Sequence, residues 1–393
     1  MARPEESPRS IEQLIASHEI VVACGSGGVG KTTTAAAMAA MAAVRHTSKV
    51  LVVTVDPAKR LADALGLEAF GNQATRIAPE AFEMAGAAPR GELWAAMLDT
   101  KQSWDDLVHR HAPDPVTTRR ILENPLYQNV TGRFVQSHDY IAVERLYELH
   151  RDGDYDLIVV DTPPTRNALD FLEAPDRMAE FFSSRLLRLL TVPYKSRLVN
   201  FASKPFYQVA DRILGTQFLQ DIAEFFILLQ TMGPGFIERA RAVDRLLHDR
   251  RTTFVVVTTL EVAPAREAEF FIDALSARRF HLGAVVLNKV LPAYLRDTTG
   301  AAALLAERLA TSAPAVAAEL APALGLADGE AQLRRVLTEV AENFARFQLV
   351  AQREAEEEAA LGRTPEVVAT VPFFDSDIVD LGGLLSLGER IWR

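Results

Sequence analysis

Residues 23–37 read ACGSGGVGKTTTAAA, a glycine-rich stretch between an apolar run and an alanine-rich segment. Its glycines, lysine and threonine fit the pattern G-x-x-x-x-G-K-[ST], which forms a tight loop between a strand and a helix. In such a loop backbone N–H groups surround a phosphate, the lysine neutralises phosphate oxygens and the hydroxyl ligates Mg²⁺. The stretch therefore predicts a nucleotide phosphate site. The residues expected to contact the nucleotide here are Gly25, Ser26, Gly27, Gly28, Val29, Gly30, Lys31, Thr32 and Thr33.

Further apolar runs predict the sheet that carries this loop. In the first 70 residues EIVVAC and KVLVVTV flank the loop and an alanine-rich helix, which is a βαβ unit. Near-continuous apolar runs suit strands that are covered on both faces, as in a parallel sheet. The expected fold is a P-loop α/β fold with a mostly parallel sheet flanked by helices. The later runs are DLIVVDT (156–162), TFVVVTTL (253–260), GAVVLNKV (283–290) and EVVATVPFF (366–374).

Two long segments without strand patterns are expected to be helical. Residues 171–250 are rich in phenylalanine and predict an inserted helical subdomain between the two parts of the P-loop domain, 1–170 and 251–393. A second helical stretch is expected over 300–362, ending in REAEEEAALGR as a solvated acidic tip. Apolar residues in this stretch fall at helical spacing and are expected to share one face: Leu333, Val336, Leu337, Val340, Phe344 and Phe347.

Composition excludes several classes of protein. The net charge of -10 argues against a nucleic-acid partner, because such proteins need clustered surplus lysine and arginine. Cys24 is the only cysteine, so an intrachain disulfide and a cysteine-built metal site within one chain are excluded. There is no apolar leader and no run near the roughly 20 apolar residues of a membrane span. We therefore expect a cytoplasmic protein.

Residues after other strands complete the predicted site. Asp161 ends a strand and is expected to hold Mg²⁺ through a bound water, while Thr32 ligates the ion directly. Asp56 also follows a strand and is a candidate to orient the attacking water, although Asp-Pro after a strand is often only a turn. Asn288 begins an N-K-x-D pattern that lacks its final carboxylate at Leu291, which favours adenine over guanine. The alternative is that Asn288 only caps the strand end.

Several separated motifs together resemble the ArsA family of ATPases. They are GGVGKTT, DPAKRLADAL (56–65), DTPPTRNALDFL (161–172) and VVLNKV, in this order. The family includes arsenite-pump ATPases and the eukaryotic ATPase that delivers tail-anchored membrane proteins; dimeric partition ATPases are more distantly similar. The resemblance implies a dimer with two ATP molecules near the interface. It also implies that Asp56 positions water, that 161–169 form a switch, and that Asn288, Pro372 and Phe373 hold adenine.

One departure from the family pattern lies in the loop. Family members usually read K-G-G-x-x-G-K-[ST], and the first lysine reaches the partner's phosphates, but here that position is Ser26. A serine cannot supply the positive charge, so the loss affects catalysis more than binding. In the two switches Lys59, Arg60, Arg166 and Asn167 stand where better-known members carry other residues. One of these arginines could replace the missing cation, or these charges point to solvent.

The expected function is Mg²⁺-dependent ATP binding and hydrolysis in a homodimer or heterodimer that acts on a client protein. A low-turnover subunit paired with a lysine-bearing paralogue is one alternative, and a membrane-cycling partition-type ATPase is another. Arsenite handling needs several thiolates, which argues against it here. Phenylalanines in the helical subdomain form either its own core or an apolar client groove. The basic segment 183–210 either faces solvent or contacts an anionic membrane or an acidic partner.

Overall fold

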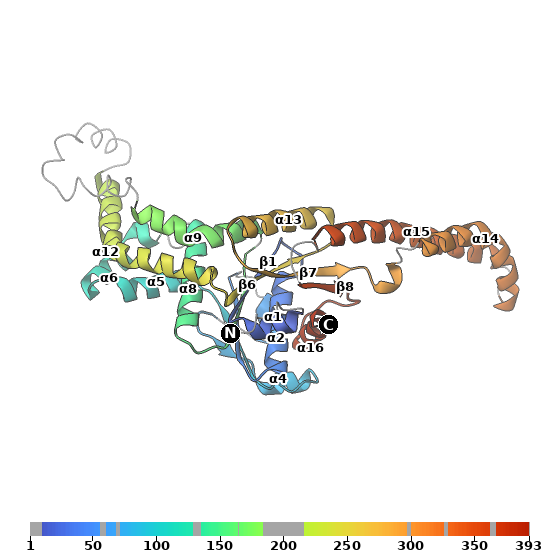
Figure 1. The fold of residues 1–393 in the computed structure, drawn as a ribbon, viewed down its shortest axis with the longest axis horizontal. Coiled ribbons are helices and arrows are strands. Elements are labelled where there is room, and N and C mark those ends of the chain that lie inside the picture. Colours follow the sequence, from blue (N-terminus) through green and yellow to red (C-terminus); the bar gives the residue numbers. More distant parts are fainter. Residues whose placement is uncertain are drawn as a thin grey trace, which may run out of the picture.

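The computed structural model describes residues 10–55, 60–67, 71–128, 135–163, 165–183, 216–296, 300–325, 329–361 and 367–392. Its centre is an eight-stranded sheet in the order β3-β4-β2-β5-β1-β6-β7-β8 (Figure 1). All neighbouring strands are parallel except β3 and β4. The predicted mostly parallel α/β sheet is therefore confirmed. The strands are β1 (Ile20–Cys24), β2 (Lys49–Thr54), β3 (Thr75–Arg76), β4 (Glu92–Met97), β5 (Leu157–Asp161), β6 (Thr252–Thr258), β7 (Leu282–Val290) and β8 (Val367–Pro372).

Alternation of side chains along the strands creates two cores, one on each face of the sheet. In β1, Ile20, Val22 and Cys24 belong to one core, whereas Val21 and Ala23 belong to the other. Because both faces are buried, every residue of β1 is apolar, as the sequence patterns predicted.

Small residues let helices approach one face of the sheet closely. Ten residues of α2 from Thr34 to Ala43 are buried, and most of them are alanines. The C-terminal helix α16 packs directly on α2, and Gly388 lies so close to Met41 that an added methyl group would overlap it. The helices on this face are α1 (Ile11–Ser17), α2 (Lys31–Arg45), α3 (Arg60–Leu65), α4 (Pro79–Met84) and α16 (Leu381–Ile391).

The other face carries a helical lobe that extends away from the sheet (Figure 1). Its helices come from residues before position 171 as well as from the predicted 171–250 segment, whose boundaries stay a prediction. Sequence patterns missed β3, which has only two residues, and β4, whose short run ELWAAM contains no β-branched residue. The helices of this face are α5 (Thr100–His111), α6 (Pro115–Glu123), α8 (Val135–Arg151), α9 (Thr165–Ser183), α12 (Thr216–Leu247) and α13 (Val262–Ala277).

A two-helix arm, α14 (Ala301–Ala323) and α15 (Glu330–Leu361), projects from the end of the sheet opposite the helical lobe (Figure 1). The expectation of a solvated acidic tip at REAEEEAALGR was wrong. Glu354 is 8% exposed and accepts a hydrogen bond from the backbone N–H of Leu291 at 2.9 Å, so this segment is the base of the arm. The burial raises the pKa of the Glu354 carboxyl.

None of the described helices combines the length and the apolar character that crossing a bilayer requires. The basic segment 183–210 lies outside the described residues except for Ser183, the last residue of α9. Its predicted contact with a membrane or an acidic partner therefore stays a prediction.

Candidate active site

The P-loop joins β1, near the middle of the sheet, to the first turn of α2. Two of its glycines are required by the structure. Gly25 lies against the backbone of β6, where a methyl group would overlap the carbonyl oxygen of Val257. Gly30 has a φ of 91°, and a methyl group there would overlap the side-chain amide of Asn288. The loop therefore has a shape that only glycine permits at both positions.

The N-terminus of α2 is open toward the loop. Gly30 is the N-cap and offers no side chain to the first backbone N–H groups, and the first turn contains no acidic residue. These N–H groups and the helix dipole create a positive potential at the loop. The Lys31 side chain, 6% exposed, adds a full charge in the same place. The arrangement suits a phosphate.

A buried carboxylate lies beneath the loop. Asp161 at the end of β5 is fully buried, and its Oδ2 accepts hydrogen bonds from the hydroxyls of Thr32 at 2.8 Å and Thr54 at 2.9 Å. The ammonium group of Lys31 lies 3.5 Å from Oδ1. A buried carboxylate is costly unless it is paired in this way. Sequence reasoning missed Thr54; its signal was a hydroxyl near the end of the apolar run KVLVVTV.

β7 supports the loop from its other side. The Asn288 amide donates to the carbonyl oxygen of Val29 at 2.7 Å, and its Oδ1 accepts from the backbone N–H of Lys289. Lys289 has a φ of 57° and its ammonium donates to the carbonyl oxygen of Gly28 at 3.1 Å. Asn288 therefore supports the P-loop. This role does not depend on its predicted contact with adenine. No role was predicted for Lys289 from the sequence. The feature that could have indicated one is the N-K pair at the end of a strand.

The residues predicted to hold adenine lie at the same edge of the sheet. Pro372, the last residue of β8, is paired in register with Val290. The backbone N–H of Phe373 donates to the carbonyl oxygen of Val290 at 2.9 Å, and the Phe373 side chain is 62% exposed. Val290 follows Asn288 by two residues, so Phe373 is held near the Asn288 end of β7. Its exposed ring offers a face to a planar base.

Ser26 and Cys24 are both buried, with different chemistry. Within the described part of the chain the Ser26 hydroxyl has no hydrogen-bond partner, and the residue is 8% exposed. A buried hydroxyl without a partner is unusual. Burial raises the pKa of the Cys24 thiol to about 12. Cys24 is therefore not a thiolate at neutral pH, and it is inert as a soft metal ligand.

Several predicted site residues fall outside the description. Asp56 and Lys59 are not among the described residues, and nothing is described of the side chains of Arg60, Arg166 and Asn167. The strand that leads to Asp56 does reach the site, because the backbone N–H of Val55 donates to the carbonyl oxygen of Asp161 at 3.2 Å. The roles predicted for these residues stay predictions.

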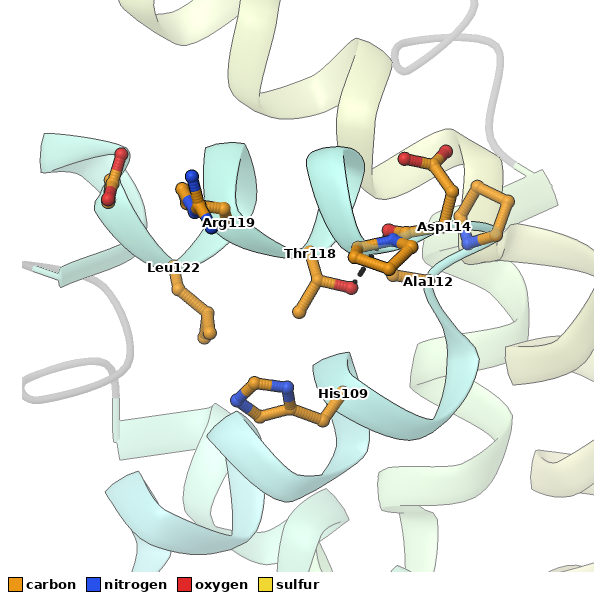
Figure 2. Close-up of a pocket in the computed structure, with 9 residues that line it drawn as sticks. His109, Ala112, Asp114, Thr118, Arg119 and Leu122 are labelled. Carbon is orange, nitrogen blue, oxygen red and sulfur yellow. Dashed lines mark hydrogen bonds between the residues drawn. The ribbon is translucent and has the colours of Figure 1, made fainter.

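Two hollows lie near the site and on the helical lobe. A cavity of about 190 Å³ beside the start of α2 is lined by Thr32, Thr33, Leu61 and Ile378, among others. A larger one, of about 580 Å³, lies between α5 and α6 and contains no P-loop residue (Figure 2). Figure 2 shows His109 and Leu122 facing this hollow, with Thr118 bonded to the backbone of Asp114 at its edge.

Comparisons with known proteins agree with this geometry. A family model described as anion-transporting ATPase matches residues 18–309. The chain is 25% identical over 299 residues to the ATPase ASNA1 homolog of Entamoeba dispar, covering 72% of this chain and 81% of that protein. It is 25% identical over 273 residues to the ATPase GET3 of Podospora anserina, covering 68% and 71%. It is 24% identical over 280 residues to the putative arsenical pump-driving ATPase 2 of Aquifex aeolicus, covering 70% and 80%.

Proposed function

The chain belongs to the anion-transporting ATPase family, and we propose that its hydrolysis of ATP drives the opening and closing of a dimer that acts on a client protein. The observation that carries this proposal is the group of Lys31, Thr32 and Asp161 beneath the P-loop. It brings an ammonium, a hydroxyl and a carboxylate to the point where the phosphates would lie. The same carboxylate ends the strand that leads into the helical lobe.

The donor set at Asp161 fits Mg²⁺. Among the described residues no cluster of three or more acidic, cysteine or histidine side chains forms a metal cage. One carboxylate and one hydroxyl beside a phosphate site are what Mg²⁺ commonly uses in proteins, with phosphate oxygens and waters as its other ligands. The Thr32 oxygen would ligate the ion directly while its hydroxyl still donates to Asp161, and Asp161 would hold the ion through a water. The ion supplies neutralisation of phosphate charge.

The nucleotide is held by the P-loop, which follows β1, and by residues at the ends of β7 and β8. Loop N–H groups and Lys31 bind the phosphates, with the Ser26 hydroxyl available to donate to a phosphate oxygen. The missing carboxylate at Leu291 favours adenine, with Asn288, Pro372 and Phe373 as its contacts. Asp56 then orients the attacking water toward the terminal phosphate.

A continuous connection from Asp161 to the helical lobe supports a nucleotide-driven movement. The Thr162 hydroxyl donates to the carbonyl oxygen of Ala23 at 2.9 Å, which ties the start of this segment to β1. α9 begins at Thr165 and packs against α8 and α12. A change in the charge of the ligand at Asp161 would therefore affect α9, the helix that enters the lobe. Closing of the lobe is the step that we propose acts on a client.

Thiol chemistry argues for a client other than arsenite. One similar protein is named as arsenical pump-driving, but the only cysteine of this chain is buried and protonated at neutral pH. As(III) prefers several soft thiolates. We therefore propose a protein client, and the cytoplasm as the compartment.

Ser26 favours a second candidate function, a subunit with low turnover on its own. The buried serine brings no cation to the interface of a dimer, and cations supplied from a partner raise phosphoryl transfer by about 10³ to 10⁵. A paralogue that keeps the family lysine would supply this charge. In that case the functional dimer is a heterodimer.

The direct test is ATP turnover of the full chain with Mg²⁺, alone and with a lysine-bearing paralogue. Asp56→Asn should abolish hydrolysis and leave the Kd for ATP near that of the parent. Lys31→Ala should remove both properties. Hydrolysis by Asp56→Asn at the parent rate would show that another group positions the water.

The opening and closing of the dimer is tested by sedimentation of the chain in its ATP and ADP states. A difference between the two profiles is expected, and identical profiles would exclude the movement.

A further inference from the structure

The apolar residues of α15 that were expected to share one face of the helix lie on two different faces. One face packs on α14, where buried or half-buried residues recur every four and three positions: Leu337, Ala341, Phe344, Gln348 and Ala351. On α14 the matching face is a line of alanines, including Ala313 and Ala317. This alternation of four and three is the spacing of a coiled-coil seam.

A second seam on α15 is exposed. Val336, Val340, Phe347 and Val350, here called the α15 stripe, are 47%, 51%, 44% and 43% exposed. Their spacing of four, seven and three again follows a heptad pattern, with Asn343 at the remaining position. Isolated exposed apolar residues are common on protein surfaces, but four in heptad register along one helix form a surface shaped for another helix.

A row of charges runs beside the α15 stripe. Arg335, Glu339, Glu342, Arg346, Arg353 and Glu357, here called the charge row, are spaced by four, three, four, seven and four residues, so they follow one side of the helix. In order their signs are plus, minus, minus, plus, plus, minus. Reading the row from its other end gives the opposite sign at every position. The spacing is not symmetric, so about an axis at position 346 four of the six charges meet an opposite charge, Arg335 with Glu357 and Glu339 with Arg353.

We propose that a second copy of this chain pairs with α15 in antiparallel orientation through the α15 stripe. In this arrangement Arg335 faces the partner subunit's Glu357 and Glu339 faces the partner subunit's Arg353, while Arg346 lies at the axis beside its own copy. A parallel pair in register would place each charge against its own copy. Burial of the stripe supplies the association energy, whereas the exposed charges select the orientation and the register.

The position of the symmetry axis makes this contact separate from the nucleotide site. The axis passes near Arg346, close to the middle of α15 (Glu330–Leu361), a helix about 48 Å long at 1.5 Å per residue. Because the arm projects from the sheet (Figure 1), antiparallel pairing places the two ATPase bodies at opposite ends of the joined arms. The matched family region, 18–309, ends before α15 begins. The pairing therefore needs no nucleotide, and it is distinct from the proposed nucleotide-driven dimer.

Sedimentation velocity of the full chain without nucleotide tests the contact. Val340→Glu with Phe347→Glu places two carboxylates in the stripe. Ala345→Glu with Gln352→Glu is a matched control, with the same spacing and charge on exposed positions of the opposite face. We expect concentration-dependent dimers of the parent and the control, and loss of at least ten-fold in affinity for the stripe variant, at unchanged helix content by circular dichroism. A parent that stays monomeric, or a stripe variant that associates like the control, would overturn the proposal.

Cysteine cross-linking tests the orientation, because Cys24 is buried and gives little background. Arg346→Cys lies near the axis and should form an intermolecular disulfide with an added copper oxidant. Arg335→Cys should not, since the two copies of position 335 would lie about 33 Å apart along the helix, well beyond disulfide reach. The reverse result would overturn the antiparallel arrangement. Both cross-linking and association should persist in Lys31→Ala, which lacks the nucleotide response, so failure of this proposal and failure of the proposed function are distinguishable.

Discussion

At the scale of single residues, Asn288 and Gly30 show how the P-loop is held. The amide of Asn288 bonds the carbonyl oxygen of Val29, and it occupies the space that any side chain at position 30 would need. The loop is therefore supported by a residue 259 positions away in the chain. Its shape depends on the packing of β7 as well as on its own glycines.

This contact predicts a difference between two glycine substitutions. Gly28 and Gly30 both have positive φ, so alanine costs each about 1–2 kcal/mol. Only at Gly30 would the methyl group also overlap Asn288, whereas the space at Gly28 is open within 4 Å. We expect Gly30→Ala to weaken ATP binding at least ten-fold more than Gly28→Ala does, measured by isothermal titration. Equal Kd values for the two variants would show that Asn288 does not constrain the loop.

At the scale of elements, buried charges join α12 to α8 in the helical lobe. Arg239 of α12 pairs with Glu144 and with Glu148 of α8, which are 2% and 4% exposed. Arg110 of α5 and Arg145 also pair with Glu148, so the network spans three helices. Because the carboxylates are buried, the network depends on every partner.

Removing one partner should destabilise the lobe. Arg239→Met leaves Glu144 buried without its cation, and breaking such a pair costs about 3–5 kcal/mol. We expect a loss near the lower end, because Tyr140 still donates to Glu144. The control is Arg177→Met, whose pairs are partly exposed at the surface and contribute at most about 1 kcal/mol. Urea unfolding followed by circular dichroism measures both, and equal midpoints for the two variants would contradict the role of the network.

The base of the arm predicts a pH effect. Burial raises the pKa of Glu354 in the folded chain, so unfolding releases a proton once the pH exceeds the unfolded value, about 4.3 for glutamate. The stability contributed by the protonated form is complete below that value and is lost as pH rises through the folded pKa. Glu354→Gln keeps an acceptor for the Leu291 N–H. We expect its Tm to exceed that of the parent at pH 7, and the gain to shrink toward pH 4.

Exposed Glu356 provides the control for this experiment. Glu356→Gln should change Tm by much less, and with no comparable pH dependence. A Tm of Glu354→Gln below the parent at neutral pH would show that the carboxylate charge itself stabilises the base of the arm.

At the scale of the whole molecule, Ser26 bears on which chains form the proposed catalytic dimer. If no cation of this chain reaches the partner's phosphates, Ser26→Lys should raise ATP turnover of the isolated chain at least ten-fold, since trans cations contribute about 10³ to 10⁵. Binding of ATP should change little, because the loop, Lys31 and Asp161 are intact. Steady-state kinetics of the parent and the variant measure this. Unchanged turnover would indicate that another cation already reaches the partner's phosphates, or that a lysine side chain introduced at this buried position cannot extend to them.

The sequence alone determined the elements that depend on neighbouring residues. The P-loop pattern, the apolar strands and Asp161 at a strand end were all readable, because glycine spacing and continuous hydrophobicity act within a few positions. Boundaries of the predicted runs agree with β5 to β8 within a residue or two. The roles of Asp56 and of the switch cations stay predictions.

Only the tertiary structure decided which distant residues meet. Thr54 shares Asp161 with Thr32, and Lys289 supports Gly28, because parallel strands bring their carboxyl ends to one edge of the sheet. The acidic segment became a buried base since Glu354 packs against the end of β7. The apolar residues of α15 were divided by α14, which covers Leu337 and Phe344 and leaves Val336, Val340 and Phe347 exposed. Helical spacing shows that residues share a side of a helix, but only packing decides which part of that side is buried.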